Sequence, residues 1–224
     1  NPGWRLGSFS SLQHGAESEI AASDHDGQAT AVDGDGEAPA PVSELAADDI
    51  LHFPRGASAG DCLHALFERI DFTDAAQWPE AIDYVLARHP QTPPGPPSNP
   101  LSERLPAMLR RLLFDVLSTP LPDGLLLANI GRSQRLVELT FNLPTAPLSP
   151  TTLNAWLTEH GYVMPRLAFQ PLSGYLKGYI DLIVHHRGRY YLIDWKSNHL
   201  GPRQADYHQA RLAEAMNQHG YHLQ

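Results

Sequence analysis

Two strand-like segments separated by a short turn constrain the fold more than any other feature of this sequence. Residues 175–186 and 190–196 are rich in Tyr, Ile, Leu and Val, and Arg187-Gly188 lies between them. This composition around a Gly-containing turn predicts a β-hairpin. If the turn has an even number of loop residues, Asp181 lies directly opposite Asp194 in the hairpin.

Two opposed carboxylates on one face of a hairpin repel each other, and a positive charge between them would stabilise both in the ionised form. Directly opposed residues have Cβ atoms about 4.5–5.5 Å apart. At that separation one carboxyl group takes up a proton unless a cation lies between the two. Lys196 follows Asp194 by two residues and therefore lies on the same strand face. Mg²⁺ prefers oxygen ligands and can activate water against a phosphodiester, so the three residues are compatible with a hydrolytic site. The alternative is an exposed hairpin with an Asp–Lys surface ion pair, worth under about 1 kcal/mol.

The remaining patterns predict a mixed α/β domain, with a mixed sheet flanked by helices, from about residue 52 onward. Leu63, Leu66, Phe67 and Ile70 have helical spacing, with Ser58 or Asp61 as the N-cap. Further helices are expected at 78–88, 105–117, 151–160 and 204–218, and the alternating residues 135–143 predict a strand. In that strand Val137, Leu139, Phe141 and Leu143 share the apolar side.

Residues 16–51 are expected to form a flexible acidic linker. Residues 16–50 hold ten Asp or Glu and no Lys or Arg, so most of the formal net charge of −9 belongs to this stretch. Its Ala, Asp, Glu, Gly and Pro content buries too little apolar surface to fold. The nearly neutral remainder is therefore compatible with a polyanionic partner.

The cysteine count and the apolar runs set limits on the class of protein. Cys62 is the only cysteine, which excludes an internal disulfide framework and favours a reducing compartment. No apolar run approaches the roughly 18 residues of a membrane span. A cytoplasmic protein without membrane contact is expected.

Two longer motifs resemble the nuclease domain of the RecB family, the beta subunits of exodeoxyribonuclease V. They are Gly-Tyr-Ile-Asp-Leu-Ile (178–183) and Gly-Arg-Tyr-Tyr-Leu-Ile-Asp-Trp-Lys-Ser-Asn-His-Leu-Gly (188–201). The similarity extends to Phe53–Ser58, to Leu63–Glu68 and to Tyr221–Gln224. Residues 52–224 are thereby identified as a RecB-like nuclease domain of the PD-(D/E)xK, restriction-endonuclease-like kind, truncated at its C-terminus. Residues 1–15 are similar to the end of the helicase region.

The resemblance implies a metal site with named ligands. Mg²⁺ would be held by His64, Asp181, Asp194 and the main-chain carbonyl of Trp195, and Lys196 would be catalytic. Taken alone, a histidine at position 64 is more often a helix-surface or hydrogen-bonded core residue than a metal ligand. Glu68, one helical turn after His64, could accept a hydrogen bond from the imidazole or be solvated. Glu138 is similar to an additional acidic position of the family, or is a plain exposed residue.

The resemblance also implies DNA as substrate and a set of partners. The expected activity is that of a Mg²⁺-dependent exonuclease in recombinational double-strand break repair, acting in a bacterial cytoplasm on single strands from unwound duplex. RecC- and RecD-like subunits and RecA are the expected partners. ATP would bind only in a helicase part, because the motif Gly-x-x-x-x-Gly-Lys-Ser/Thr is absent from these residues.

The sequence leaves more than one function open for this chain. Gln224 matches the first residue of a DNA-holding Gln-hydrophobic-x-x-Tyr motif whose Tyr is absent, so this chain could be incomplete as a catalyst. Six basic residues could contact phosphates: Arg55, Lys177, Arg187, Arg189, Arg203 and Arg211. The main alternative is a catalytically inactive, nuclease-like module that guides DNA or docks a protein. A third reading is a nuclease outside the recombination complex.

Overall fold

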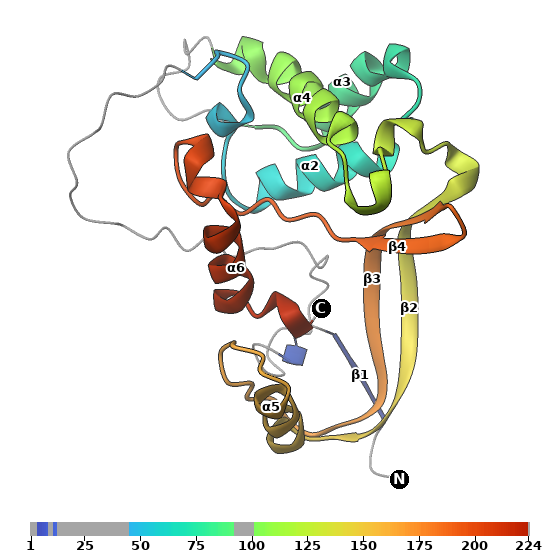
Figure 1. Cartoon of the computed structure of the whole chain (residues 1–224), viewed down its shortest axis with the longest axis vertical. Coiled ribbons are helices and arrows are strands. Elements are labelled where there is room, and N and C mark those ends of the chain that lie inside the picture. The colour runs from blue at the N-terminus through green and yellow to red at the C-terminus, as the bar shows by residue number, and fades with distance from the viewer. Residues whose placement is uncertain (1–3, 9–10, 13–44, 92–100, 224) are drawn as a thin grey trace, which may run out of the picture. The chain divides into compact units, whose positions relative to one another are not determined.

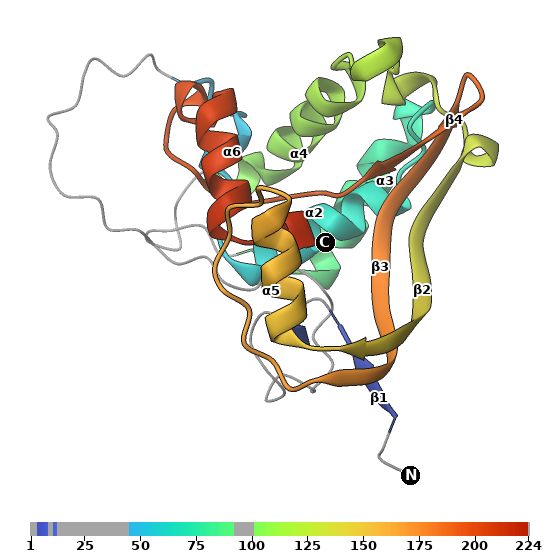
Figure 2. The same ribbon diagram turned by 60° about the horizontal axis from the view of Figure 1, so that its bottom comes forward.

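The strands form a mixed sheet in the part of the chain that the structure, a computed structural model, describes: residues 4–8, 11–12, 45–91 and 101–223. Its four strands are β1 (Arg5–Gly7), β2 (Arg135–Leu148), β3 (Leu172–His186) and β4 (Arg189–Ile193). The longest, β3, lies beside β2 in both views (Figures 1 and 2), pairs in parallel with β1, and pairs antiparallel with β4.

The described helices occur in the sequence order that the patterns predict. The α-helices are α2 (Ala57–Arg69), α3 (Trp78–Arg88), α4 (Leu101–Ser118), α5 (Pro150–Glu159) and α6 (Gln209–Gln218). Short 3₁₀ helices lie at Ile50–His52, Ala75–Gln77, Pro122–Gly124, Leu127–Asn129, Arg132–Gln134, Gln204–Tyr207 and Tyr221–Leu223. The mixed α/β class is confirmed, and the arrangement is consistent with a restriction-endonuclease-like fold. None of the described helices is both long and apolar enough to cross a membrane.

The chain divides into two compact units, each built from separate stretches of sequence. Unit 1 contains the described residues of Asn1–Asp24, Leu139–Ile180 and Gln204–Gln224. Unit 2 contains those of His25–Glu138 and Asp181–Arg203. The nuclease domain predicted over 52–224 therefore contributes to both units.

The core of unit 2 joins the helices α2, α3 and α4 to the β3–β4 hairpin. Leu66 on α2, Val85 on α3 and Leu109 on α4 are fully buried in one cluster. Leu182 and Val184 of β3 are buried in the same cluster, and partly buried Ile193 of β4 packs against it. The hairpin is thereby fixed against α2, the helix that carries His64.

The hairpin register agrees with the prediction. Leu182 pairs with Ile193 and His186 with Arg189, which leaves a two-residue turn of Arg187 and Gly188. Both turn residues have positive φ, 49° and 75°, as in the type I′ turns that match the twist of antiparallel strands.

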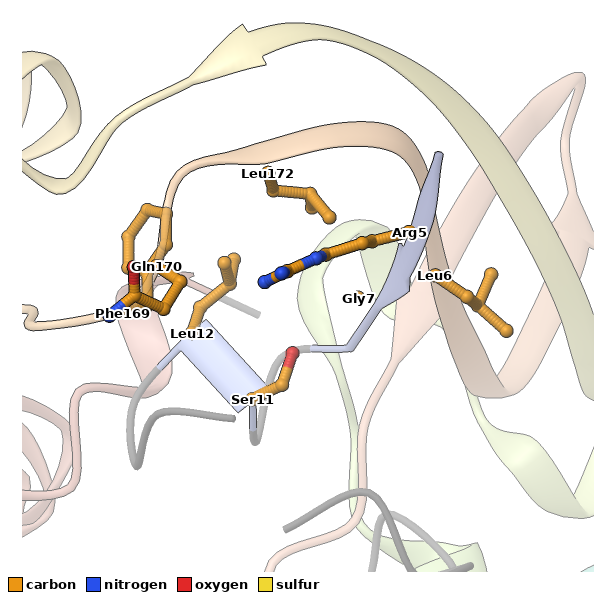
Figure 3. A pocket seen from close by; sticks show the side chains of 8 residues that line it. All are labelled: Arg5, Leu6, Gly7, Ser11, Leu12, Phe169, Gln170 and Leu172. Carbon is orange, nitrogen blue, oxygen red and sulfur yellow. The ribbon is translucent and has the colours of Figure 1, made fainter. Parts of the chain in front are cut away.

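The core of unit 1 is smaller and lies on one side of its strands. Leu172 of β3, Leu157 of α5 and Leu167 are buried together, and Leu176 packs against them. On the same side a shallow pocket opens where β1 meets β3 (Figure 3). The Arg5 side chain crosses this pocket, whereas Leu6 points away from it.

Several details differ from the sequence-based expectations. Helix α2 begins after Gly56, whose φ is 101°, so neither Ser58 nor Asp61 is its N-cap. Helix α4 starts earlier than residue 105 and contains Pro106. Strand β4 ends at Ile193, so Asp194 and Lys196 follow the strand and are not part of it.

The strand predicted at 135–143 exists, but its apolar side is not buried. Val137, Leu139 and Leu143 are exposed. Glu138 has φ 50°, a left-handed conformation that interrupts extended geometry, so simple alternation does not hold through it. Residues 13–44, most of the predicted linker, lie outside the described residues, and the end of that linker overlaps the 3₁₀ helix at Ile50–His52.

Candidate functional site

His64 lies on the buried face of α2. Its neighbours on that face, Gly60 and Phe67, are also buried, and His64 itself is only 5% exposed. Its Nδ1 atom lies 3.6 Å from Oδ2 of Asp181 on β3. The structure thus brings together two residues of the predicted ligand set that are more than one hundred positions apart in sequence.

Asp181 also ties β3 to the residues that follow β4. Its Oδ2 accepts a hydrogen bond of 2.7 Å from the main-chain N–H of Trp195. This N–H lies one residue beyond Asp194, so the carboxylate of Asp181 meets the backbone of the segment that carries the other predicted site residues. Asp181 and Asp194 are the next residues outward from the Leu182–Ile193 pair, as the predicted register requires.

Helix α2 holds this segment through two further contacts. The indole of Trp195 stacks on Phe67, with ring centroids 4.4 Å apart and planes 20° apart. Closer to the start of the helix, a Cβ atom at Gly60 would lie only 3.0 Å from Oγ of Ser197. On one face of α2, Gly60 and Phe67 therefore contact this segment, and His64 between them contacts Asp181 of β3.

Asp194 and Lys196 form a second ion pair at the site. Nζ of Lys196 lies 2.6 Å from Oδ2 of Asp194. The side chain of Lys196 is 20% exposed and that of Asp194 is 41% exposed, in contrast to 12% for Asp181 and 6% for His64. The site thus has a buried His–Asp pair and a more exposed Lys–Asp pair.

The structure does not gather all predicted ligands into one cluster. Among the described residues no group of three or more His, Cys, Asp or Glu side chains is placed to hold a metal ion. Glu68 is half-buried on α2, and Glu138 is half-buried at the positive φ in β2. Gln224 lies outside the described residues. The roles of these residues stay predictions.

The chemistry of the donors fits a divalent cation even though their arrangement is not closed around one. Two carboxylates, an imidazole and a main-chain carbonyl are ligand types that divalent metals accept. Asp181, which contacts both His64 and Trp195, is common to the two halves of the set. Because the Asp194 side chain is exposed, a change in its side-chain conformation alone would change its position relative to the carboxylate of Asp181.

A clamp on the hairpin was missed from the sequence. Asp123 accepts hydrogen bonds at Oδ2 from Arg189 (2.8 Å) and from the hydroxyl of Tyr191 (2.6 Å). Its carbonyl oxygen accepts a third from Arg187. This acceptor raises the pKa of Tyr191, because the neutral phenol is the donor to a carboxylate. Pro122-Asp123-Gly124 signals a turn, but nothing in the sequence indicates its contact with the hairpin.

Comparisons with known proteins relate the whole chain to one kind of subunit. No protein-family model matches it. It is 34% identical over 229 residues to the RecBCD enzyme subunit RecB of Escherichia coli (strain K12), covering 99% of this chain and 18% of that protein. The same-named subunit of Haemophilus influenzae is 30% identical over 95% of this chain and 18% of its own length. For Mycobacterium tuberculosis (strain ATCC 25618 / H37Rv) the identity is 31%, over 99% and 22%.

These relatives are similar to the chain along almost its entire length, although the chain spans about a fifth of theirs. The similarity therefore extends well beyond the hairpin motifs. The chain belongs to the family of RecBCD enzyme RecB subunits.

Proposed function

We propose that this chain carries the site of a metal-dependent DNA nuclease that hydrolyses phosphodiester bonds. One observation carries the proposal: His64 from α2 lies 3.6 Å from Asp181 on the hairpin that also leads into Asp194 and Lys196. A hairpin with a surface ion pair needs no buried histidine beside its first carboxylate. Membership of the RecB family supports the same reading.

Each of the predicted site residues would have its own role. His64, Asp181, Asp194 and the carbonyl of Trp195 would hold the cation, with Mg²⁺ as the proposed ion because most of the donors are oxygens. The bound cation would supply Lewis acidity and an activated water. Lys196 would orient that water and offset charge on the phosphate, and its contact with Asp194 keeps the ammonium at the site. Glu68 would accept a hydrogen bond from the imidazole of His64, and Glu138 would bind the metal through a water molecule.

A degradation assay tests the function. The chain should degrade single-stranded DNA with Mg²⁺, and Asp194→Asn should lower the rate by about 10²-fold or more, in the range for loss of a catalytic group. Asp115→Asn is the matched control, because Asp115 is an exposed carboxylate paired with Arg111 on α4 of the same unit. Equal rates for Asp194→Asn and Asp115→Asn, or no degradation by the unaltered chain, would contradict the proposal.

Metal binding has a readout that needs no catalysis. A ligand that binds only the folded state raises the midpoint of thermal unfolding. Mg²⁺ should raise the midpoint of the unaltered chain and of Asp115→Asn, and should not raise that of Asp181→Asn. The same shift in all three proteins would place the cation elsewhere.

The larger assembly is also a proposal, because the chain spans about a fifth of its relatives. Their name, RecBCD enzyme subunit RecB, supports RecC- and RecD-like subunits as partners, recombinational repair as the process and the bacterial cytoplasm as the location. RecA loading and an ATP-driven helicase in a longer protein belong to the same proposal.

A second candidate is the inactive DNA-guiding or docking module. The absence, among the described residues, of three or more donor side chains placed to hold a metal ion favours it. The two candidates differ in the degradation assay, since the module would bind DNA and leave it intact.

A further inference from the structure

We infer that the outward face of the unit 1 strands, carrying Trp4, Leu6, Tyr175, Lys177 and Tyr179, binds single-stranded DNA by base stacking. This stacking face, defined by these five residues, lies entirely within unit 1. The choice of DNA as its occupant rests on the proposed function.

Alternation along β3 separates the stacking face from the core. Leu172 is buried in the core of unit 1 and Leu176 packs against it, so residues 172, 174 and 176 face inward. Tyr175, Lys177 and Tyr179 have the opposite parity and face outward. Leu6 pairs with Tyr175 across the β1–β3 ladder, which places it on the same side, and it points away from the pocket in Figure 3.

Two aromatic residues of this face, Trp4 and Tyr175, are exposed to solvent. Trp4 is 73% exposed and Tyr175 41% exposed. Their rings lie 5.6 Å apart and are tilted by 50°, so they contact each other and leave much of the indole free. Each nucleotide base has a π-face, and stacking on an aromatic side chain contributes about 1–3 kcal/mol per base.

The charge of the face suits a polyanion. Nζ of Lys177 lies 5.0 Å from the ring centroid of Tyr179, which interleaves a cation with the aromatic series. The strand residues of unit 1 (5–7, 139–148 and 172–180) include Arg5 and Lys177 and no Asp or Glu. A phosphate backbone therefore meets attraction and no repulsion from the strands themselves.

Two glycines of β3 lie in close contacts with neighbouring strands. A Cβ atom at Gly174 would lie 2.2 Å from the carbonyl oxygen of Arg5, and one at Gly178 would lie 2.3 Å from the Phe141 ring. Gly174 thus permits the close approach of β1 to β3, and Gly178 leaves room for the Phe141 ring. Sheet faces with exposed aromatic residues are used as stacking platforms by other single-strand binders.

Binding of a labelled oligothymidylate in the presence of a chelator tests the inference without cleavage. Trp4→Ala and Tyr175→Ala should each weaken binding about 5- to 100-fold, as loss of one stacked base predicts. Tyr175→Phe keeps the ring and should stay within about twofold of the unaltered chain. The matched control is Tyr162→Ala. Tyr162 is also 41% exposed and also belongs to unit 1, but it follows α5 and stacks on Trp156 of that helix.

The salt dependence isolates the contribution of Lys177. Lys177→Gln should reduce the slope of log K against log salt concentration by about 0.7, the value for one phosphate contact on a single strand. Arg166→Gln, at an exposed position outside the strands, should leave the slope unchanged.

The outcomes separate this inference from the proposed function. If Trp4→Ala and Tyr175→Ala bind as tightly as Tyr162→Ala, the stacking face is wrong, and a protein partner becomes the expected occupant. That result leaves the function intact if Asp194→Asn still abolishes degradation in Mg²⁺. Weak binding by the two alanine variants together with normal degradation by Asp194→Asn would instead support the face and contradict the catalytic assignment.

Discussion

Asp181 combines a structural contact with its proposed role as a ligand. The oxygen that lies 3.6 Å from His64 also accepts the N–H of Trp195. Removing the whole carboxylate would break this hydrogen bond and loosen the segment that carries Asp194 and Lys196. Asparagine keeps an acceptor oxygen of the same size and removes the charge. Asp181→Asn is therefore the informative substitution for metal binding. Asp181→Ala would remove both the charge and the acceptor for the N–H of Trp195, so a loss of metal binding could come from either.

Asp71 shows how local hydrogen bonds set acid stability. Its Oδ1 accepts from the N–H and the hydroxyl of Thr73, and its Oδ2 accepts from Arg132. These contacts, with that of the Thr73 side chain the largest, lower the pKa of Asp71 from 3.8 to about 2. Because the folded-state pKa lies below the unfolded one, this stabilisation is complete above the unfolded pKa and is lost as the pH falls toward 2.

Asp71→Asn should accordingly lower the free energy of unfolding near neutral pH, and the difference from the unaltered chain should shrink between about pH 4 and pH 2. Urea unfolding at a series of pH values measures both quantities. Thr73→Ala provides a second arm, since it should raise the pKa of Asp71 seen by NMR. A difference in unfolding free energy that is constant across this pH range would contradict the assignment.

The element that carries the site, the β3–β4 hairpin, is held at both ends. Asp123 binds its turn end through Arg187, Arg189 and Tyr191, and α2 contacts the segment beyond Ile193 through Phe67 and Trp195. The conformation of Asp123 itself, with φ 59°, is one that only a minority of non-glycine residues adopt. The geometry of the hairpin thus depends on a turn more than sixty residues earlier in sequence.

Asp123→Asn tests this clamp. The pKa of Tyr191 should fall toward its ordinary value, because the charged acceptor that raises it is gone. The free energy of unfolding should decrease by about 1 kcal/mol, as for a partly exposed charge-assisted contact. NMR titration of the Tyr191 ring gives the pKa, and Asp115→Asn serves as the carboxylate control. An unchanged Tyr191 pKa would mean that its hydroxyl does not meet Asp123 in solution.

Local patterns made these elements predictable, and contacts between distant segments did not follow from them. Strand-forming composition and the even turn at Arg187-Gly188 gave the correct hairpin register, because a turn fixes register locally. Helical spacing of apolar residues located α2 and α3, because this spacing is also a local pattern. Strand β1 has three residues, and its partner is β3, so no local pattern marks it. The end of β4 before Asp194 depends on the Asp181–Trp195 hydrogen bond, which is equally non-local.

The same limit applies to the site. The pairing of His64 with Asp181 was expected from family resemblance and not from spacing, since a helix and a hairpin meet only through the core of unit 2. The pairing of Asp194 with Lys196 is a contact within two residues, which a strand face predicts. What sequence could not supply is the relative depth of the two pairs, because burial depends on packing by α2.

At the scale of the whole molecule, both units are discontinuous in sequence. The core of unit 2 needs Leu182 and Val184 from β3 as well as the helices α2, α3 and α4. The core of unit 1 combines Leu12 with residues after 139. Strands β2 and β3 each contribute residues to both units. Folding of either unit therefore requires chain from both sides of residue 138.

A chain cut between Glu138 and Leu139 tests this dependence. The fragment ending at Glu138 lacks the hairpin that covers Leu66 and Leu109, and loss of such buried contacts costs several kcal/mol, comparable with the stability of a whole domain. Each fragment alone should therefore unfold without a cooperative transition in urea and should bind a hydrophobic dye, whereas the uncut chain should show a sigmoidal transition. Coexpression of the two fragments should restore the transition, because the missing segments are then supplied. A cooperative transition for the first fragment by itself would show that the helices form an independent core and that the hairpin, with its site residues, is only appended to it.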